Sequence, residues 1–352
     1  MKKSLYILFF WKPSSRKYAK SHLRLALPLL LFASLTIAGC WPARLLVHNI
    51  EESITGEPEK VKTFSNPVHD SVKVSVLMIG HSATLVQIYD KVIMFDPFFN
   101  KRFGGVIMRR TEPGLRIDSL KQLDVIFVSH SHMDHLSYSS LDMLTEKFPN
   151  SKIVFPEGTE NYLPDYKVSM IRVNKADTRF RNFIGRSVYV SGMKVTPVFA
   201  YHNGGRYGFD TYTWREEGAT GFIVEYKDVT FYYAGDSGYH DTAFKQIGEK
   251  FDIGVSLIPI GPCRNCDSTG FWHHTSSIEA LELFKDIKAD YMIPVHYGTV
   301  KYFTDENRPL QVLNELVDSL TAYKPLKEKI IALKPGEQKV WKQTGVTVEG
   351  TQ

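Results

Sequence analysis

The sequence has few cysteines, only three in 352 residues, and no internal repeat or low-complexity tract. Three cysteines cannot build the disulfide framework of a small secreted scaffold. Apolar residues make up 43% of the chain and charged residues 23%. This balance excludes a collagen-like chain, a disordered chain and a protein with many membrane spans. We therefore expect a globular protein with a large buried core.

The chain also lacks the distributed positive charge of a nucleic-acid-binding protein. Its formal net charge is +5, but residues 1–39 contain seven basic residues and no acidic one, so the remainder carries 5 − 7 = −2. The basic character therefore belongs to the N-terminal leader, and we expect no nucleic acid among the partners.

An apolar stretch follows these basic residues, from Leu25 to Ala38, and ends at Gly39-Cys40. Such an order is typical of a secretory signal and is short for a membrane span. Ile37-Ala38-Gly39-Cys40 resembles the bacterial lipoprotein box, in which the cysteine becomes the lipidated N-terminus. We predict a signal peptide over residues 1–39, lipidation at Cys40 and a membrane-anchored, extracytoplasmic lipoprotein, periplasmic or on the outer face. An uncleaved anchor or ordinary secretion is the alternative.

Residues 40–71 are polar and contain four prolines and glycines, which is typical of a tether and an N-terminal extension. A single catalytic domain is predicted over residues 72–345. Early strand hairpins followed by strand–helix alternation predict an α/β (α+β) domain of two packed mixed sheets with helices outside. The predicted strands are 72–79, 83–89, 91–95, 124–128, 152–155, 193–199, 221–226, 229–233, 255–258 and 291–294. The predicted helices are 139–148, 276–287 and 310–320, and segments 329–333 and 338–341 are expected at a sheet edge.

The densest group of candidate metal ligands is His130-Ser131-His132-Met133-Asp134-His135, directly after a predicted buried strand. The chain must turn there, so these side chains can converge, and imidazole and carboxylate groups suit zinc. A solvated histidine-rich turn is the alternative. His202, Asp236 and His296 each follow a predicted strand, where loops gather on a rigid frame, and can complete the site. Glycines on either side of Asp236 predict a close approach of the backbone there.

This order of ligands resembles the metallo-β-lactamase superfamily, whose fold is an αβ/βα sandwich with a dinuclear metal site between the sheets. The resemblance implies two zinc ions per chain. It assigns His130, His132 and His202 to one metal, Asp134, His135 and His296 to the other, and Asp236 to both. It also implies that Asp96, in Phe95-Asp96-Pro97, orients ligands without binding metal. An ordinary Asp-Pro turn is the alternative for Asp96.

Further motifs are similar to N-acylphosphatidylethanolamine-hydrolysing phospholipase D over about residues 74–300. They are Ile79-Gly80-His81-Ser82-Ala83-Thr84, Phe95-Asp96-Pro97-Phe98-Phe99, Ala234-Gly235-Asp236-Ser237-Gly238-Tyr239, Leu257-Ile258-Pro259-Ile260-Gly261 and Pro294-Val295-His296-Tyr297-Gly298-Thr299. Sugar-lactone hydrolases share the first of them. The chain departs from that phospholipase at Ser131, Met133, Ser137 and Asn203, which bears on head-group and acyl-chain specificity rather than on the metals.

The resemblance implies a membrane-tethered phosphodiesterase of the phospholipase D type that attacks N-acylphosphatidylethanolamine-like lipids with a metal-bridging hydroxide. Asp134 and His274 are the expected catalytic residues. His274 would stabilise a phosphoryl oxygen or protonate the leaving alkoxide, and His81 would support the ligands from behind. Expected partners are a phospholipid or another small phosphodiester and, through Cys40, a membrane, with the oligomeric state open and a homodimer included.

Three rival functions remain open from the sequence. The first is a lactone or β-lactam hydrolase on the same dizinc site, and the second is an iron-dependent oxygen- or sulfur-metabolising enzyme. A binding protein with a vestigial site is the third, although no predicted ligand is missing.

Two weaker signals lie near the predicted site. Cys263 and Cys266 are expected to form a loop-stapling disulfide in an oxidising compartment, rather than half of a zinc knuckle or a redox pair. Aromatic residues after His202 predict a lipid- or substrate-binding lip, with ordinary loop packing as the alternative. They are Tyr201, Tyr207, Phe209, Tyr212 and Trp214.

Overall fold

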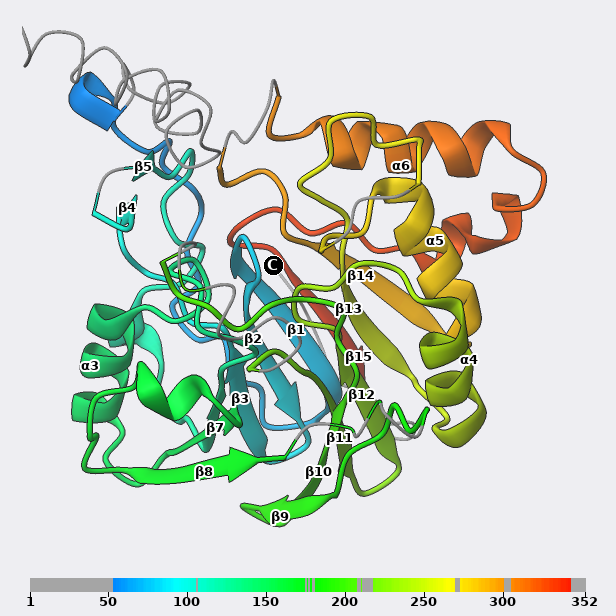
Figure 1. Ribbon diagram of the computed structural model, residues 1–352. Coiled ribbons are helices and arrows are strands. Elements are labelled where there is room, and N and C mark those ends of the chain that lie inside the picture. Colours follow the sequence, from blue (N-terminus) through cyan, green and yellow to red (C-terminus); the bar gives the residue numbers. More distant parts are fainter. Residues whose placement is uncertain are drawn as a thin grey trace, which may run out of the picture. The chain divides into compact units, whose positions relative to one another are not determined.

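The structure is a computed structural model that describes residues 53–342 except 106, 175, 177, 179–180, 208–209, 211–217, 270–272 and 301–304. The predicted signal peptide, residues 1–39, and Cys40 lie outside the described residues. Two sheets pack face to face and helices cover their outer sides (Figure 1). The predicted α/β sandwich is therefore confirmed. Within the described part of the chain, no helix combines the length and hydropathy needed to cross a membrane.

The first sheet has seven strands in the order β15-β1-β2-β3-β6-β7-β8. Short hairpins join β1, β2 and β3, so these strands pair antiparallel, whereas β3, β6, β7 and β8 run parallel. The strands are β1 (Val72–Gly80), β2 (Ala83–Ile88), β3 (Lys91–Phe95), β6 (Val125–Phe127), β7 (Lys152–Pro156), β8 (Ser169–Val173) and β15 (Gln338–Lys342).

The second sheet has six strands in the order β14-β13-β12-β11-β10-β9. Strands β12, β13 and β14 are parallel, and the others pair antiparallel. They are β9 (Val188–Val190), β10 (Met193–Val198), β11 (Gly221–Tyr226), β12 (Val229–Tyr233), β13 (Val255–Pro259) and β14 (Tyr291–Val295). A small hairpin of β4 (Arg102–Phe103) and β5 (Ile107–Met108) stands apart from both sheets.

In the part of the chain that the structure describes, helices α3 to α6 lie on the outside of the sandwich. They are α3 (Tyr138–Lys147), α4 (Asp241–Lys250), α5 (Ser277–Asp286) and α6 (Arg308–Ser319), accompanied by 3₁₀ segments Ile117–Ser119, Thr159–Asn161 and Lys324–Lys329. Capping residues in the sequence mark the first residues of α3 and α5. Ser137 caps α3, and Ser276 forms a capping box with Glu279 at the start of α5.

The core consists of an apolar layer between the sheets and a second layer beneath the helices. Alternating residues of the strands fill the central layer, because successive side chains of a strand point to opposite faces. Phe95 of β3 packs on Phe127 of β6 and on Phe231 of β12, with ring centroids 4.9 and 5.8 Å apart. These aromatic contacts join the two sheets directly below the ends of β3 and β6.

The described part of the N-terminal extension follows the surface of the domain. The backbone N–H of Glu59 donates to the carbonyl of Arg110, and Phe64 forms a bridge with Leu115. The Gln338 side chain also donates to the Pro67 carbonyl. Residues 59–67 are therefore attached to the catalytic domain along their length.

All ten predicted strands and all three predicted helices are present with small shifts of their ends. Segment 338–341 closes the sheet edge as β15, which pairs with β1. Segment 329–333 also meets a sheet edge, because after the 3₁₀ segment Lys324–Lys329 the residue Ile330 forms one bridge with Met292 of the edge strand β14. Strands β8 and β9 and helix α4 were not predicted. Much of β8 is exposed, so its sequence does not carry the apolar run of a buried strand.

The contact between α4 and α5 supplies a test of the packing. A Cβ added at Gly248 in α4 would lie 2.2 Å from the Asp286 carbonyl oxygen and 2.7 Å from Ile287 Cα. Alanine favours a helix by about 1 kcal/mol over glycine, but such a clash with backbone costs about 1–3 kcal/mol. The net effect is a loss, and we expect Gly248→Ala to lower the free energy of unfolding by up to about 2 kcal/mol in urea titrations.

Gly254→Ala is the matched control, because the nearest atom to its added Cβ is 3.8 Å away. Its effect should stay within about 0.5 kcal/mol of the wild type. A Gly248→Ala protein more stable than the wild type would contradict the close packing of α4 on α5.

Candidate metal centre

The ends of parallel strands from both sheets place the candidate site. Asp96 directly follows β3, and the segment 130–135 follows the neighbouring strand β6. In the second sheet, Asp236 follows β12 and His296 follows β14, with β13 between them. Gly235, at φ +64°, allows the two loops to approach, since an added Cβ would lie 2.9 Å from Ser129 Cβ. The expected close approach beside Asp236 is thus confirmed.

His130, His132 and His202 form the first group of potential ligands. His132 Nδ1 lies 2.9 Å from His130 Nε2 and 3.1 Å from His202 Nε2. Zinc–nitrogen bonds of about 2.0–2.1 Å in a tetrahedral site place donor atoms about 3.3 Å apart. The three imidazoles therefore have nearly the spacing of ligands around one metal ion.

Asp134, His135 and His296 form the second group, and His81 joins them. The Oδ2 atom of Asp134 lies 3.8 Å from Nε2 of both His135 and His296, and 3.1 Å from His81 Nε2. The sequence predicts that His81 lies behind the metal ligands. The structure instead places His81 Nε2 within hydrogen-bond distance of Asp134 Oδ2.

Asp236 lies between the two groups. Its Oδ2 atom is 3.2 Å from His135 Nε2 and 3.1 Å from His296 Nε2, both of the second group. The same oxygen is 3.9 Å from Nε2 of His130 and of His202 in the first group. This carboxylate is therefore placed to contact metal ions in both positions.

Hydrogen bonds on the outer sides of the rings fix which nitrogen faces inward. Asp96 accepts from the hydroxyl of Ser129, so that hydroxyl oxygen in turn accepts from His130 Nδ1 at 2.9 Å. His202 Nδ1 donates to the His273 carbonyl at 2.7 Å, and His135 Nδ1 donates to Asp96 at 2.6 Å. In the neutral form of each ring, Nε2 consequently presents a lone pair to the interior, which is the form that binds a metal.

Asp96 accepts four hydrogen bonds in the interior of the protein. They come from the backbone N–H of Ser129 at 2.7 Å, its hydroxyl at 2.5 Å, His135 Nδ1 at 2.6 Å and the Tyr233 hydroxyl at 2.5 Å. Asp96 is fully buried, with φ of +41°. This is the geometry of a carboxylate that orients a ligand histidine.

The pKa of His135 in the second group is shifted in the opposite direction to the pKa values of the three histidines in the first group. Burial lowers the pKa of His130, His132 and His202, so these imidazoles are neutral and available as ligands. Burial would also lower the pKa of His135, but the carboxylates of Asp236 and Asp134 outweigh it and raise that pKa. Burial alone would raise the pKa of Asp236, yet the neighbouring imidazoles hold it well below its usual range.

Buried polar atoms without partners show that a cation fits between these groups. His135 Nε2 and Asp236 Oδ1 are buried and have no hydrogen-bond partner in the protein. Burying such atoms lowers the stability of the folded protein unless a hydrogen bond or a bound ion satisfies them. Imidazole nitrogens and carboxylate oxygens gathered in this way are the donor set of zinc and of other first-row transition metals.

His274 lies at the open side of the cluster. Its Nδ1 atom is 3.6 Å from Asp236 Oδ2, and its side chain is 26% exposed, compared with 1% for Asp236. The ring centroid is 4.9 Å from that of His202. Burial lowers the pKa of His274 to about 3. Among the predicted residues, His274 is therefore one that can meet a substrate arriving from solvent.

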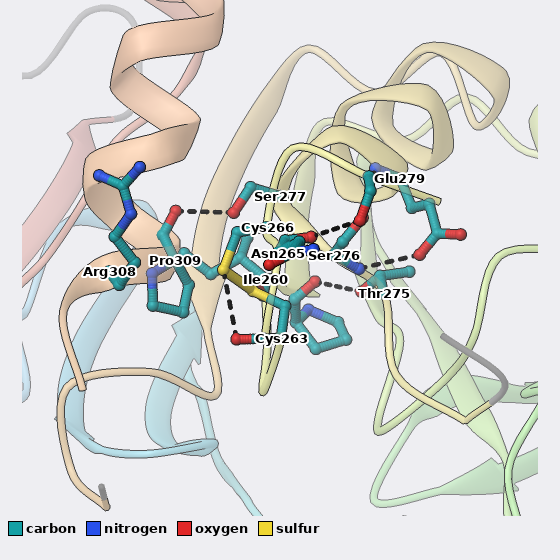
Figure 2. Close-up of a disulfide and its surroundings, with 12 residues drawn as sticks. Ile260, Cys263, Asn265, Cys266, Thr275, Ser276, Ser277, Glu279, Arg308 and Pro309 are labelled. Atoms are coloured by element: carbon teal, nitrogen blue, oxygen red, sulfur yellow. Dashed lines mark hydrogen bonds between the residues drawn. A yellow bond between two sulfur atoms is a disulfide. The ribbon is translucent and has the colours of Figure 1, made fainter. Parts of the chain in front are cut away.

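The residues that follow His274 are attached to the end of β13 and to the loop after it, which carries the disulfide in Figure 2. Cys263 and Cys266 form a disulfide, as predicted, in the loop that follows β13. The Cys266 carbonyl accepts from the N–H of Ile278 in α5. The hydroxyl of Thr275 donates to the Pro259 carbonyl at 2.5 Å. The start of α5 and the residue after His274 are thus attached to the end of β13.

A cavity of about 370 Å³ adjoins His202. Its walls include Phe183, Phe199, Tyr201 and His240. Of the predicted aromatic lip, Tyr201 and Tyr207 are 38% and 46% exposed, while Phe209, Tyr212 and Trp214 lie outside the described residues.

Sequence reasoning missed three residues that hold the site together. Ser129 and Tyr233 donate to Asp96, and the Thr299 hydroxyl accepts from the N–H of His81 at 2.7 Å. Ser129 directly precedes the ligand motif at His130, and Thr299 is the last residue of the motif Pro294-Val295-His296-Tyr297-Gly298-Thr299, so the position of each residue was a usable signal. Tyr233 has the pattern of an ordinary strand residue, and its partner is 137 residues away in the chain.

The chain is similar to known proteins over this region. Residues 91–297 match the model of the Beta-lactamase superfamily domain. N-acyl-phosphatidylethanolamine-hydrolyzing phospholipase D 1 of Caenorhabditis elegans is 30% identical over 256 residues, 68% of this chain and 69% of the relative. A UPF0173 metal-dependent hydrolase of Saccharolobus solfataricus is 30% identical over 223 residues, 63% and 83% of the two chains.

The fold also matches a solved structure. Igni18, described as a novel metallo hydrolase of the archaeon Ignicoccus hospitalis, superposes with a TM-score of 0.54 at 20% identity. The match covers 77% of this chain and 99% of that protein. At this identity the likeness concerns the fold.

Removal of one imidazole tests whether the cluster binds metal. We expect His132→Ala to lose at least one bound metal ion per chain and most activity, because no neighbouring side chain can replace that nitrogen. Elemental analysis after dialysis measures the loss. His69→Ala removes an imidazole that contacts Gln338 outside the cluster, so it should retain the metal content of the wild type. Equal metal content in all three proteins, or full wild-type activity after chelation, would contradict the assignment.

Proposed function

The chain belongs to the β-lactamase superfamily, and on this premise we propose that it is a dinuclear zinc hydrolase of phosphodiester bonds, of the phospholipase D type. The observation that carries the proposal is the pair of ligand groups that share Asp236 Oδ2. Two metal ions held in this way supply Lewis-acid activation of a water molecule and of the phosphoryl group.

The residues of the chain then have separate tasks. His130, His132 and His202 would hold one ion and Asp134, His135 and His296 the other, with Asp236 next to both. Asp96 keeps His135 in the orientation that directs Nε2 inward. These assignments leave His274 free to contact the substrate, where its neutral ring donates a hydrogen bond to a phosphoryl oxygen or to the departing oxygen.

N-acylphosphatidylethanolamine-like lipids are the proposed substrate class. The named activity of the Caenorhabditis elegans relative and the shared motifs around His81, Asp236 and His296 support this choice. The cavity beside His202 falls in the range of about 300–1,000 Å³ that small-molecule sites occupy. Its aromatic walls offer an apolar surface to a hydrocarbon part of the substrate.

Two substrates with different leaving groups test this proposal. Cleavage of a lipid diester expels an alkoxide, which needs a proton donor or an electrophile, whereas a nitrophenolate needs far less help. We expect wild-type protein to release N-acylethanolamine from lipid vesicles, as read by mass spectrometry. His274→Ala should keep both metals but lose about 10²–10³-fold on the lipid, with a much smaller loss on bis(p-nitrophenyl) phosphate.

Three other outcomes would each contradict one part of the proposal, namely the role of His274, the phosphodiester substrate or the hydrolytic reaction. Equal losses of His274→Ala on both substrates would make His274 a structural residue. Wild-type protein that cleaves a lactone or nitrocefin but no phosphodiester would favour the lactone or β-lactam alternative. Iron in elemental analysis, together with an oxygen-dependent signal, would contradict hydrolysis.

We also propose that lipidated Cys40 attaches the protein to a membrane outside the cytoplasm. The apolar stretch that ends in Ile37-Ala38-Gly39-Cys40 supports this location. Cys40→Ser should release the protein from the membrane fraction or leave an unprocessed precursor, as shown by fractionation and N-terminal mass analysis. Wild-type protein found free in the cytoplasm and still beginning at Met1 would contradict the proposal.

A further inference from the structure

Arg206 contacts both ends of the segment that supplies most of the candidate ligands. We name residues 130–136 the ligand loop. The Arg206 Nη1 atom donates to the carbonyl of Ser131 at 2.9 Å and to the carbonyl of Leu136 at 2.9 Å. His132, Asp134 and His135 lie between these two carbonyls. One nitrogen atom thus spans the part of the loop that bears three ligands.

The loop has few other backbone bonds to keep its shape. Within it, the N–H groups of His135 and Leu136 both donate to the His132 carbonyl. The carbonyls of Ser131 and Leu136 instead accept from Arg206. Both residues are fully buried, so without the guanidinium these carbonyls would lose a charged hydrogen-bond donor.

Arg206 is itself held in place. Its guanidinium lies 4.1 Å from the centroid of the Tyr138 ring, and the residue is 9% exposed. Its backbone N–H donates to Asp210 Oδ2, which also accepts from the Tyr162 hydroxyl at 2.7 Å. The Tyr138 hydroxyl donates to the Tyr162 carbonyl. Arg206 therefore approaches the loop from a fixed base rather than as a mobile surface side chain.

The position of Arg206 in the chain connects two sources of ligands. It lies four residues after His202, which belongs to the first ligand group, and it binds the loop that supplies His132 to the same group. Among the described residues, no carboxylate lies within salt-bridge distance of its guanidinium, so carbonyl dipoles and an aromatic face balance the charge.

We infer that Arg206 is a positioning residue that sets the geometry of the metal centre by fastening the ligand loop to the segment that bears His202. This inference rests on the proposed metal-binding role of the loop. Asp96 holds the same loop from the interior through His135 and Ser129, and Arg206 holds it from the other side. Loss of either contact should weaken metal binding even where every ligand is present.

Arg206→Met tests the inference because it keeps the aliphatic stem on Tyr138 and removes the donors. We expect its zinc dissociation constant, from competition with a chromophoric chelator, to rise about 10–100-fold, as for other residues that orient ligands. At saturating zinc, kcat on bis(p-nitrophenyl) phosphate should fall while KM changes little. Arg206→Lys, which keeps a charged donor, should recover most of the affinity.

Arg172→Met is the matched control, since Arg172 is exposed and pairs with Glu160. It should bind zinc as the wild type does. If Arg206→Met does not fold, Arg206→Gln replaces it, because a neutral and shorter side chain cannot reach both carbonyls. Wild-type zinc affinity in the folded variant would overturn the inference. So would an equal loss in Arg206→Lys and Arg206→Met. Because zinc binding is measured directly, wild-type protein that binds zinc but cleaves no phosphodiester would contradict only the proposed function.

Discussion

The buried carboxylate of Asp96 is the interaction on which the candidate metal centre depends. It accepts from Ser129, which follows β6 in the first sheet, from the candidate ligand His135 and from Tyr233 in β12 of the second sheet. Four donors around one carboxylate satisfy a group that would otherwise be costly to bury. The same bonds join the two sheets at the edge where the ligands gather. Formation of the site is thus coupled to the packing of the sandwich.

The orientation of the ligands follows from this arrangement. Because Nδ1 of His130, His135 and His202 is engaged on the outer side, each ring directs Nε2 into the centre. The nitrogen lone pairs then face the carboxylates of Asp134 and Asp236, and the described residues around them offer too few hydrogen-bond donors. A bound cation would satisfy these atoms. Asp96 and Arg206 both hold the ligand loop through hydrogen bonds. We therefore expect metal binding by this loop to depend on residues that are not themselves ligands.

Much of the fold and of the ligand set was predictable from the sequence, because the information is local. Strands such as Lys91–Phe95 and Gly221–Tyr226 have continuous apolar, β-branched patterns, and His130–His135 is dense in ligands. Exposed β8 escaped prediction because tertiary packing decides its structure. Tyr233 and Arg206 act through partners far away in sequence, which a local pattern cannot indicate.

Anomalous scattering from crystals of the zinc-loaded protein, measured on both sides of the zinc absorption edge, tests the dinuclear centre most directly. Two peaks about 3.5–4 Å apart are expected. One should be bound by His130, His132 and His202 and the other by Asp134, His135 and His296, with Asp236 in contact with both. A single peak, or peaks outside these two groups of ligands, would contradict a dinuclear zinc hydrolase.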